Sequence, residues 1–179
     1  MQKTGYGLRE SFLAMVRAVL AVSLAAGIPV VLAADEAAPS ERSVLYGKSV
    51  YKSANCIGCH KWHGDGGGGY GGNTLSLRRT QLDRDNIVLV VRCGRPGTHM
   101  LYHDEKAWGE GRCYDGLKMS DLDENTRPGQ GKFISEREIQ SVTDYVLAVL
   151  KGLGEPKRKE CLVFWGQDAV STCKSYPDD

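Results

Sequence analysis

The stretch "ANCIGCHKWHGDGGGGYGGN", residues 54–73, constrains the chain more than any other feature. Two residues separate Cys56 from Cys59, and His60 follows directly. Glycines fill much of the remainder, so the segment has too little bulk for an ordinary core. Reactive side chains in such a segment indicate a cofactor or metal site, and three kinds compete: covalent haem attachment, a zinc site and a dithiol redox pair.

The spacing of these residues favours haem. Two thiols separated by two residues can each add to one vinyl group of a haem, and the imidazole of the next residue is then aimed at the iron. A structural zinc site takes four ligands, and only His63 or a distant cysteine could complete one here. A dithiol pair gives His60 no ligand role and calls for a helix where the chain has glycines. We therefore predict one covalently bound haem c, held by Cys56, Cys59 and His60.

The N-terminus has the pattern of a secretory signal peptide. Basic residues precede an apolar run over residues 18–34, and a pair of small residues that suits cleavage ends at Ala33. The run is at the short edge of the length that spans a bilayer, so an uncleaved membrane anchor is the alternative. We expect a signal peptide at 1–33 and a periplasmic location, with the membrane as a partner only if this segment is uncleaved.

Charge and length give a second set of limits. The full chain has 23 basic and 22 acidic residues. Removal of residues 1–33 takes away three basic residues and one acidic residue, which leaves 20 against 21 and a formal charge of −1. This balance does not indicate a nucleic-acid partner. The remaining 146 residues are enough for one compact domain.

Capping signals and apolar periodicity predict three helices. Ser40 is an N-cap for a helix that leads into the cysteine motif. The run "RDNIVLVVR", residues 84–92, is a second helix. Ser135 and Glu138 fit a capping box for a third helix. Its apolar residues recur at helical spacing, and they are Ile139, Val142, Tyr145, Val146, Val149 and Leu150.

With these features the chain resembles the class I cytochromes c. The segments "GKSVYKSANCIGCH" and "SEREIQSVTDYVLAVL" match the family's N-terminal helix with its haem motif and its C-terminal helix. These helices cross in the family, so Gly47 would allow a close approach, with Tyr145 packed there. The resemblance covers residues 40–153. It implies an all-α, class I cytochrome c fold: a few helices wrapped around one covalent haem, with long loops.

The resemblance also implies a methionine as the second axial ligand. The segment "RCGRPGTHMLYHD" is similar to the family's ligand loop, "G-R-P-G-T-x-M-P", and gives Met100 this role. Thioether ligation raises the reduction potential and fills the sixth site, which suits electron transfer. Met119, His99 and His103 are the alternatives. Outside that role, His99 and His103 are expected to face solvent, as is His63.

Two positions depart from the family pattern. Family members often have a proline after the first glycine-rich loop, and its carbonyl accepts a hydrogen bond from the ligand histidine. The corresponding "GGNTLSL" has no proline, so another carbonyl must orient His60, and the sequence does not identify it. Leu101 replaces the proline that frequently follows the ligand methionine, which leaves this loop less rigid.

Four further cysteines are expected to pair, because thiols of an exported chain tend to oxidise. Three pairings exist, and the simplest joins neighbours in sequence: Cys93 with Cys113, and Cys161 with Cys173. The first would bracket Met100 and restrict the ligand loop. The second would close a small C-terminal appendage. There we expect Phe164 and Trp165 to be buried, since large exposed apolar groups are uncommon on soluble monomers.

These observations divide the chain into a signal peptide at 1–33, a cytochrome c domain at 34–156 and a C-terminal disulfide-closed extension at 157–179. Electron carriers often use positive charge near the haem edge to steer encounters with redox partner proteins. The basic residues expected there are Lys48, Lys52, Lys61, Arg78, Arg79 and Arg95.

The function we expect is that of a one-electron carrier rather than an enzyme. The donor would be a periplasmic dehydrogenase and the acceptor the respiratory chain. The loop disulfide and closed tail look similar to cytochromes that accompany quinoprotein alcohol dehydrogenases. Two alternatives stay open. One is a haem enzyme or gas sensor with a labile sixth ligand, and the other is a haem subunit of a larger redox complex, with Phe164 and Trp165 at the interface.

Overall fold

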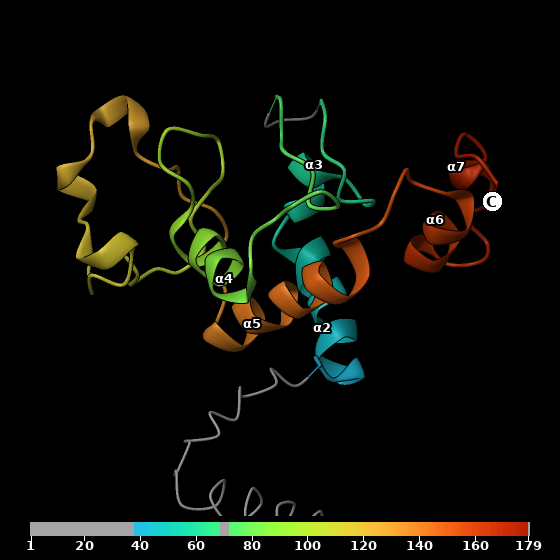
Figure 1. Cartoon of the computed structure of the whole chain (residues 1–179), viewed down its shortest axis with the longest axis horizontal. Helices are drawn as coiled ribbons and strands as arrows, with labels where there is room; N and C mark the ends of the chain where they lie inside the picture. The colour runs from blue at the N-terminus through green and yellow to red at the C-terminus, as the bar shows by residue number, and fades with distance from the viewer. Residues whose placement is uncertain (1–37, 69–71, 179) are drawn as a thin grey trace, which may run out of the picture. The chain divides into compact units, whose positions relative to one another are not determined.

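The computed structural model describes residues 38–68 and 72–178, which belong to one compact unit, Ala38–Asp179 (Figure 1). The predicted signal peptide, residues 1–33, lies outside the described residues. The described part is mostly helical and contains no strand; one isolated bridge pairs Tyr102 with Gln130. No helix of this part is long and apolar enough to cross a membrane.

The elements follow one another as short helices joined by long loops. They are α2 (Glu41–Ser53), α3 (Cys56–His60), α4 (Arg84–Cys93), the 3₁₀ turns η1 (Tyr114–Gly116), η2 (Met119–Asp121) and η3 (Glu124–Thr126), α5 (Glu136–Tyr145) with its π-helical continuation η4 (Val146–Leu150), α6 (Arg158–Trp165) and α7 (Val170–Cys173).

The predicted helix starts are confirmed. The side chain of Ser40 accepts a hydrogen bond from the backbone N–H of Ser43 and caps α2. Ser135 and Glu138 form the capping box of α5. Asp83 caps α4 by accepting from Asn86 N–H. Each cap satisfies N–H groups that the first helical turn leaves without a partner.

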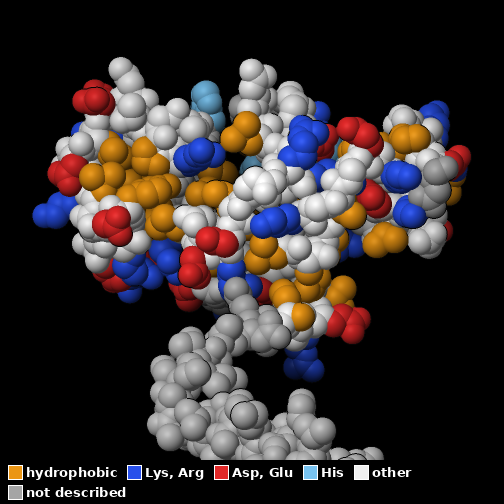
Figure 2. Space-filling model, in the orientation of Figure 1, with side chains coloured by type: hydrophobic (Ala, Val, Ile, Leu, Met, Phe, Trp, Pro, Cys, Tyr) orange, Lys and Arg blue, Asp and Glu red, His pale blue; other side chains and the backbone are white. Residues whose placement is uncertain are grey.

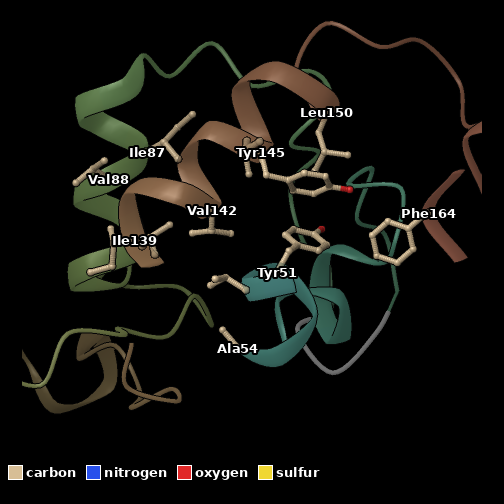
Figure 3. Close-up of a cluster of buried hydrophobic side chains, with 12 residues drawn as sticks. Tyr51, Ala54, Ile87, Val88, Ile139, Val142, Tyr145, Leu150 and Phe164 are labelled. Carbon is tan, nitrogen blue, oxygen red and sulfur yellow. The ribbon is translucent and has the colours of Figure 1, made fainter. Parts of the chain in front are cut away.

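Helices α2 and α5 cross at Gly47. A Cβ atom at this position would lie 1.9 Å from the carbonyl oxygen of Ser141 and 2.9 Å from the Cβ of Tyr145. Only glycine allows the two backbones to come this close. The rings of Tyr51 and Tyr145 pack beside the crossing with centroids 5.3 Å apart (Figure 3). The prediction for Gly47 and Tyr145 is therefore confirmed.

The main hydrophobic core joins α2, α4, α5 with its continuation η4, and one residue of α6. Its buried members are Val50, Tyr51, Ala54, Ile87, Val88, Val91, Ile139, Val142, Tyr145, Val146, Leu150 and Phe164 (Figure 3).

A polar network links the same three long helices beside this core. The Asp144 carboxylate of α5 pairs with the Arg84 guanidinium of α4 and accepts a hydrogen bond from the Ser43 hydroxyl of α2. The Asp144 side chain is only 9% exposed. A buried carboxylate needs such partners, because its desolvation is otherwise costly.

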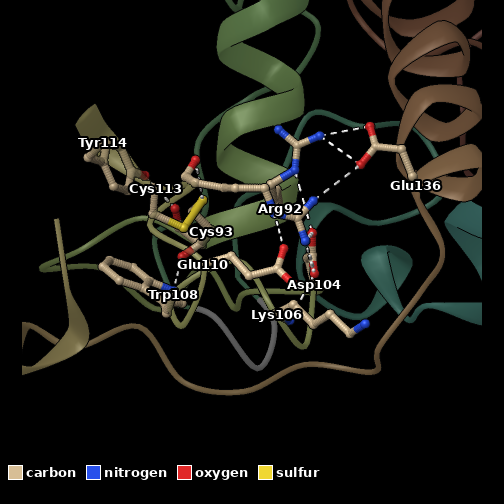
Figure 4. The surroundings of a disulfide bond; sticks show 11 residues. Arg92, Cys93, Asp104, Lys106, Trp108, Glu110, Cys113, Tyr114 and Glu136 are labelled. Carbon is tan, nitrogen blue, oxygen red and sulfur yellow. Dashed lines mark hydrogen bonds and ion pairs between the residues drawn. A yellow bond between two sulfur atoms is a disulfide. The ribbon is translucent and has the colours of Figure 1, made fainter. Parts of the chain in front are cut away.

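A long insertion between Met100 and α5 forms a second small core around the Cys93–Cys113 disulfide. Trp108 donates a hydrogen bond from its indole Nε1 to the carbonyl of Cys93, at 3.1 Å. An ion-pair network ties this region to α5, because Arg92 pairs with both Glu136 and Asp104 (Figure 4). The disulfide, the Trp108 hydrogen bond and these ion pairs therefore fix the insertion to the end of α4.

The residues 157–178 of the C-terminal extension contain α6 and α7, which the Cys161–Cys173 disulfide joins. Both disulfide pairings predicted from sequence neighbours are thus present. Phe164 is buried, as predicted, but Trp165 is 43% exposed. α6 has only two turns, so one of its two adjacent aromatic side chains packs on the core and the other remains outside.

Candidate functional site

The cysteine motif forms the five-residue helix α3. Asn55 before it and Lys61 after it both have a positive φ, 64° and 60°, so the chain turns sharply at each end. Cys56 and Cys59 are free thiols three residues apart, a spacing that places two side chains on one side of a helix. The Tyr51 hydroxyl donates to the Lys61 carbonyl at 2.8 Å, which ties the end of α3 to α2.

The imidazole of His60 has the properties of a metal ligand. Its Nδ1 is buried and has no partner in good hydrogen-bonding geometry. Burial lowers the pKa of His60 to about 4, so the ring is neutral near pH 7, as metal ligation requires. The backbone of Leu75 opposes part of this shift by hydrogen bonding and raises the pKa.

Leu75 lies in "GGNTLSL", the segment without the family's proline. Its backbone is therefore the candidate group to orient His60, which the sequence did not identify. A backbone group of any residue can accept a hydrogen bond, so the residue type leaves no signal at this position.

The glycine-rich loop folds back against the residues that follow it. Gly66 N–H approaches the His60 carbonyl at 3.3 Å, and Leu77 N–H donates to the Gly64 carbonyl at 2.7 Å. A Cβ atom on Gly66, whose φ is +68°, would lie 2.2 Å from the Thr74 carbonyl oxygen. The loop thus needs glycine here to bring Leu75 next to His60.

Met100 is at the end of a closed loop on a different segment. Its carbonyl accepts from Arg95 N–H at 3.1 Å, and its own N–H donates to the Thr98 hydroxyl at 3.2 Å. The loop begins where α4 ends at Cys93, so the disulfide to Cys113 brackets it on both sides. The candidate site thus has two halves: Cys56, Cys59 and His60 come together on α3, and Met100 lies on the loop after α4.

The alternatives to Met100 have other surroundings. Met119 packs in the second core with the Cys93–Cys113 disulfide. His103 is 5% exposed, and its Nδ1 donates to the carbonyl of Lys132 at 2.7 Å. His63 is 8% exposed and accepts from Asp65 N–H at its own Nδ1. The prediction that His63 and His103 face solvent is wrong, because backbone groups satisfy their rings inside the fold; His99 is exposed.

The predicted basic edge also needs correction. Arg78 is 3% exposed and forms an ion pair with Glu160 at 2.9 Å. Lys48 and Lys52 donate to the carbonyls of Val163 and Phe164, at 2.8 and 3.3 Å. These three cations hold the C-terminal extension. A single basic residue in a sequence does not show which segment it will contact, so this role was not predicted.

An apolar pocket of about 430 Å³ borders the Met100 loop. It is lined by Leu82, Asn86, Leu89, Val90, Arg95, Pro96, Tyr114, Leu117 and Leu122. Figure 2 shows hydrophobic side chains, in orange, gathered on the left of the view. None of the four predicted haem-binding residues lines the pocket, so it adjoins the candidate site without containing it.

The α3 half of the site fits a covalently held haem. It offers the half-buried free thiols of Cys56 and Cys59, next to a neutral imidazole whose Nδ1 has no partner in good hydrogen-bonding geometry. Burial raises the pKa of the Cys56 thiol to about 12. The residues 38–68 and 72–178 contain no group of three or more histidine, cysteine, aspartate or glutamate side chains placed to hold a metal ion.

Comparison with protein-family models gives a match to cytochrome c over residues 44–149. Comparisons with curated proteins and with solved structures gave no match. The matched range begins in α2, includes α3 and the Met100 loop, and ends in η4. It spans more than half of the chain, and on this basis the protein belongs to the cytochrome c family.

Proposed function

We propose that this protein is a periplasmic monohaem cytochrome c that carries single electrons from a periplasmic dehydrogenase to the respiratory chain. Membership of the cytochrome c family implies covalently bound haem c and haem-based electron transfer. The observation that carries the proposal is the arrangement on α3, where two free thiols adjoin a neutral imidazole whose Nδ1 is buried.

Each site residue has a distinct role in this proposal. Cys56 and Cys59 would hold the haem through thioether bonds, and His60 and Met100 would bind its iron. Bound there, the haem supplies a one-electron couple between ferric and ferrous iron. The polypeptide holds the ligands in place through the Tyr51–Lys61 hydrogen bond on one half and the closed Met100 loop on the other.

Filled axial positions favour a carrier over an enzyme. If His60 and Met100 were both bound, no position on the iron would be free for a substrate, and the thioether ligand would raise the reduction potential. An electron donor of the quinoprotein alcohol dehydrogenase type is the more specific form of the proposal. It rests on the disulfide-bracketed ligand loop and the closed tail, which resemble cytochromes that accompany such enzymes.

A second candidate function is a haem subunit of a larger redox complex. Val163 and Trp165 of the extension are 69% and 43% exposed, and exposed apolar groups indicate an interface. Phe164 is buried and would not take part. In that case the native protein would migrate as a complex after mild extraction, and removal of these two side chains would release it.

The visible spectrum tests the ligand assignment. We expect the ferric protein to show a methionine-to-iron charge-transfer band. Met100→Ala should abolish the band, lower the reduction potential and allow carbon monoxide to bind the ferrous haem. Met119→Ala is the matched control and should retain the wild-type spectrum. A wild-type protein that lacks the band, or that binds carbon monoxide readily, would contradict the carrier proposal.

A further inference from the structure

The C-terminal extension contacts Trp62, two residues after the proposed axial histidine. The indole Nε1 of Trp62 donates to the Tyr176 hydroxyl at 2.9 Å, and the two rings meet edge to face with centroids 4.9 Å apart. Phe164 of α6 also lies against Trp62, at 6.0 Å between centroids. Trp62 is therefore contacted by two aromatic residues that are twelve positions apart in the extension.

The disulfide of the extension connects the two segments that contact Trp62. Cys161 lies in the same helix as Phe164, and Cys173 lies three residues before Tyr176. The Arg158 N–H donates to the Pro177 carbonyl at 2.9 Å, which joins the two segments a second time. The extension is thus closed around its contact with Trp62.

Buried and half-buried cations fasten the extension to the rest of the fold. The Arg78 guanidinium pairs with Glu160 of α6 and donates to the carbonyls of His63, at 3.1 Å, and Gly154, at 2.6 Å. One side chain therefore joins the extension to the segment after α3. Lys52 adds a contact from α2, because its ammonium lies 4.5 Å from the centre of the Phe164 ring.

The helix that carries the proposed axial histidine cannot hold its position alone. α3 has five residues, and an isolated helix of that length is unstable in water. The Leu75 backbone acts on the His60 ring, but His60 Nδ1 has no hydrogen bond in good geometry, so contacts of the adjoining chain also contribute to the orientation of the ring. The Tyr51–Lys61 hydrogen bond acts next to α3 from the core, and the extension acts one residue further on.

We propose that the extension is a positioning element for the axial histidine: its disulfide-closed structure holds Trp62 and thereby sets the orientation of His60 at the haem. Trp62 is the positioning residue, and Phe164 and Tyr176 hold it. The inference rests on the proposed function, in which His60 is an axial ligand. It adds that residues outside the family-matched range, 44–149, determine the geometry of that ligand.

Three variants of the haem-loaded, full-length protein test this proposal. Tyr176→Phe removes one hydroxyl and leaves the ring. The double variant Cys161→Ala with Cys173→Ala opens the extension. Val170→Ala is the control, because Val170 lies in the extension but is 50% exposed. Far-UV circular dichroism checks that all three keep the wild-type helix content.

Two NMR measurements report on the two steps of the proposal. Amide hydrogen exchange of residues 58–64 measures how firmly the segment is held. We expect it to accelerate roughly fivefold in Tyr176→Phe, the size expected for losing one net hydrogen bond, and by more in the cysteine double variant. The hyperfine-shifted haem methyl resonances of the ferric protein measure the orientation of the axial histidine. We expect them to move in both variants and to stay in place in Val170→Ala.

The outcomes separate this inference from the proposed function. If the wild type shows haem methyl resonances of a histidine-ligated haem and both variants reproduce them, the extension does not position His60 and the inference is overturned. The same holds if Val170→Ala moves them as much as Tyr176→Phe does. If the wild type itself shows no histidine-ligated haem, the proposed function fails first and the inference fails with it.

Discussion

Gly47 of α2 lies against the backbone of Ser141 in α5 so closely that a Cβ atom at position 47 would be 1.9 Å from the Ser141 carbonyl oxygen. The obstacle is backbone in a helix, which cannot move aside as a side chain could. We predict that Gly47→Ala separates the two helices and lowers the free energy of unfolding by about 3 kcal/mol or more, as severe overpacking does.

Urea denaturation of the haem-loaded protein measures this effect. Gly109→Ala is the matched control, because a Cβ there would meet nothing closer than 3.8 Å. Equal stability of Gly47→Ala and Gly109→Ala would show that the helix crossing tolerates a side chain, contrary to the structure.

A second prediction concerns the stability that the buried Asp144 provides. Asp144→Asn keeps the shape of the side chain but removes the charge that pairs with Arg84. We expect a loss of about 2 to 3 kcal/mol in the free energy of unfolding, because removing one partner of a buried, hydrogen-bonded ion pair is destabilising.

The surface pair of Arg79 with Asp65 provides the comparison, because Arg79 is 68% exposed. Arg79→Ala should change the free energy of unfolding by less than about 1 kcal/mol, as solvent screens such pairs. If both variants lowered the free energy of unfolding by the same amount, the Asp144 network would have no greater structural role than a surface pair.

The Cys93–Cys113 disulfide is predicted to stabilise the Met100 loop. Replacing both cysteines by alanine opens a cross-link that spans 20 residues, whose loss costs about 3 kcal/mol in the chain-entropy account. Because the disulfide brackets Met100, the ferric methionine charge-transfer band should lose intensity at a lower temperature than in the wild type.

Val170→Ala serves as the control for this effect, since Val170 lies outside the ligand loop and is 50% exposed. If heating abolishes the methionine band at the same temperature in the wild type, in Val170→Ala and in the Cys93→Ala, Cys113→Ala variant, the bracketing disulfide has no influence on ligation.

The buried His103 predicts a pH dependence of stability. Burial lowers the pKa of His103 below its ordinary 6.5, although the hydrogen bond to Lys132 opposes this shift. The unfolded chain therefore binds a proton more readily than the folded protein does. The stability that neutral His103 contributes is present above the unfolded value and is lost as the pH falls from 6.5 toward the folded pKa.

Replacing His103 by glutamine tests this sign. A glutamine amide can still donate to the Lys132 carbonyl but does not titrate. The free energy of unfolding should fall less steeply between about pH 7 and about pH 5 in His103→Gln than in the wild type. Identical slopes would show that His103 does not contribute.

Local patterns predicted three of the helices well, namely α2, α4 and α5. The caps Ser40 and Ser135 could be predicted because each bonds to a residue only three positions away, and a sequence displays such a pair directly. The motif of Cys56, Cys59 and His60 is equally local. The close helix approach at Gly47 could be predicted because, in the resembled family, the N-terminal and C-terminal helices cross there.

Long-range contacts explain what the sequence did not reveal. His63 is buried where the extension meets the loop after α3. Arg78 pairs with Glu160 in the same region, although the two residues lie 82 positions apart in the sequence. The role of Leu75 depends on its backbone, which every residue has. The contact of Trp62 with Tyr176 joins positions 114 residues apart, and neither residue is part of a recognised motif.

The central claim is that Cys56 and Cys59 bind one haem covalently, and the intact mass of the denatured protein tests it most directly. We predict a polypeptide that carries the mass of one haem after acid and organic solvent have removed all non-covalent cofactor. A polypeptide mass without haem, from cells that load other c-type cytochromes, would contradict the account.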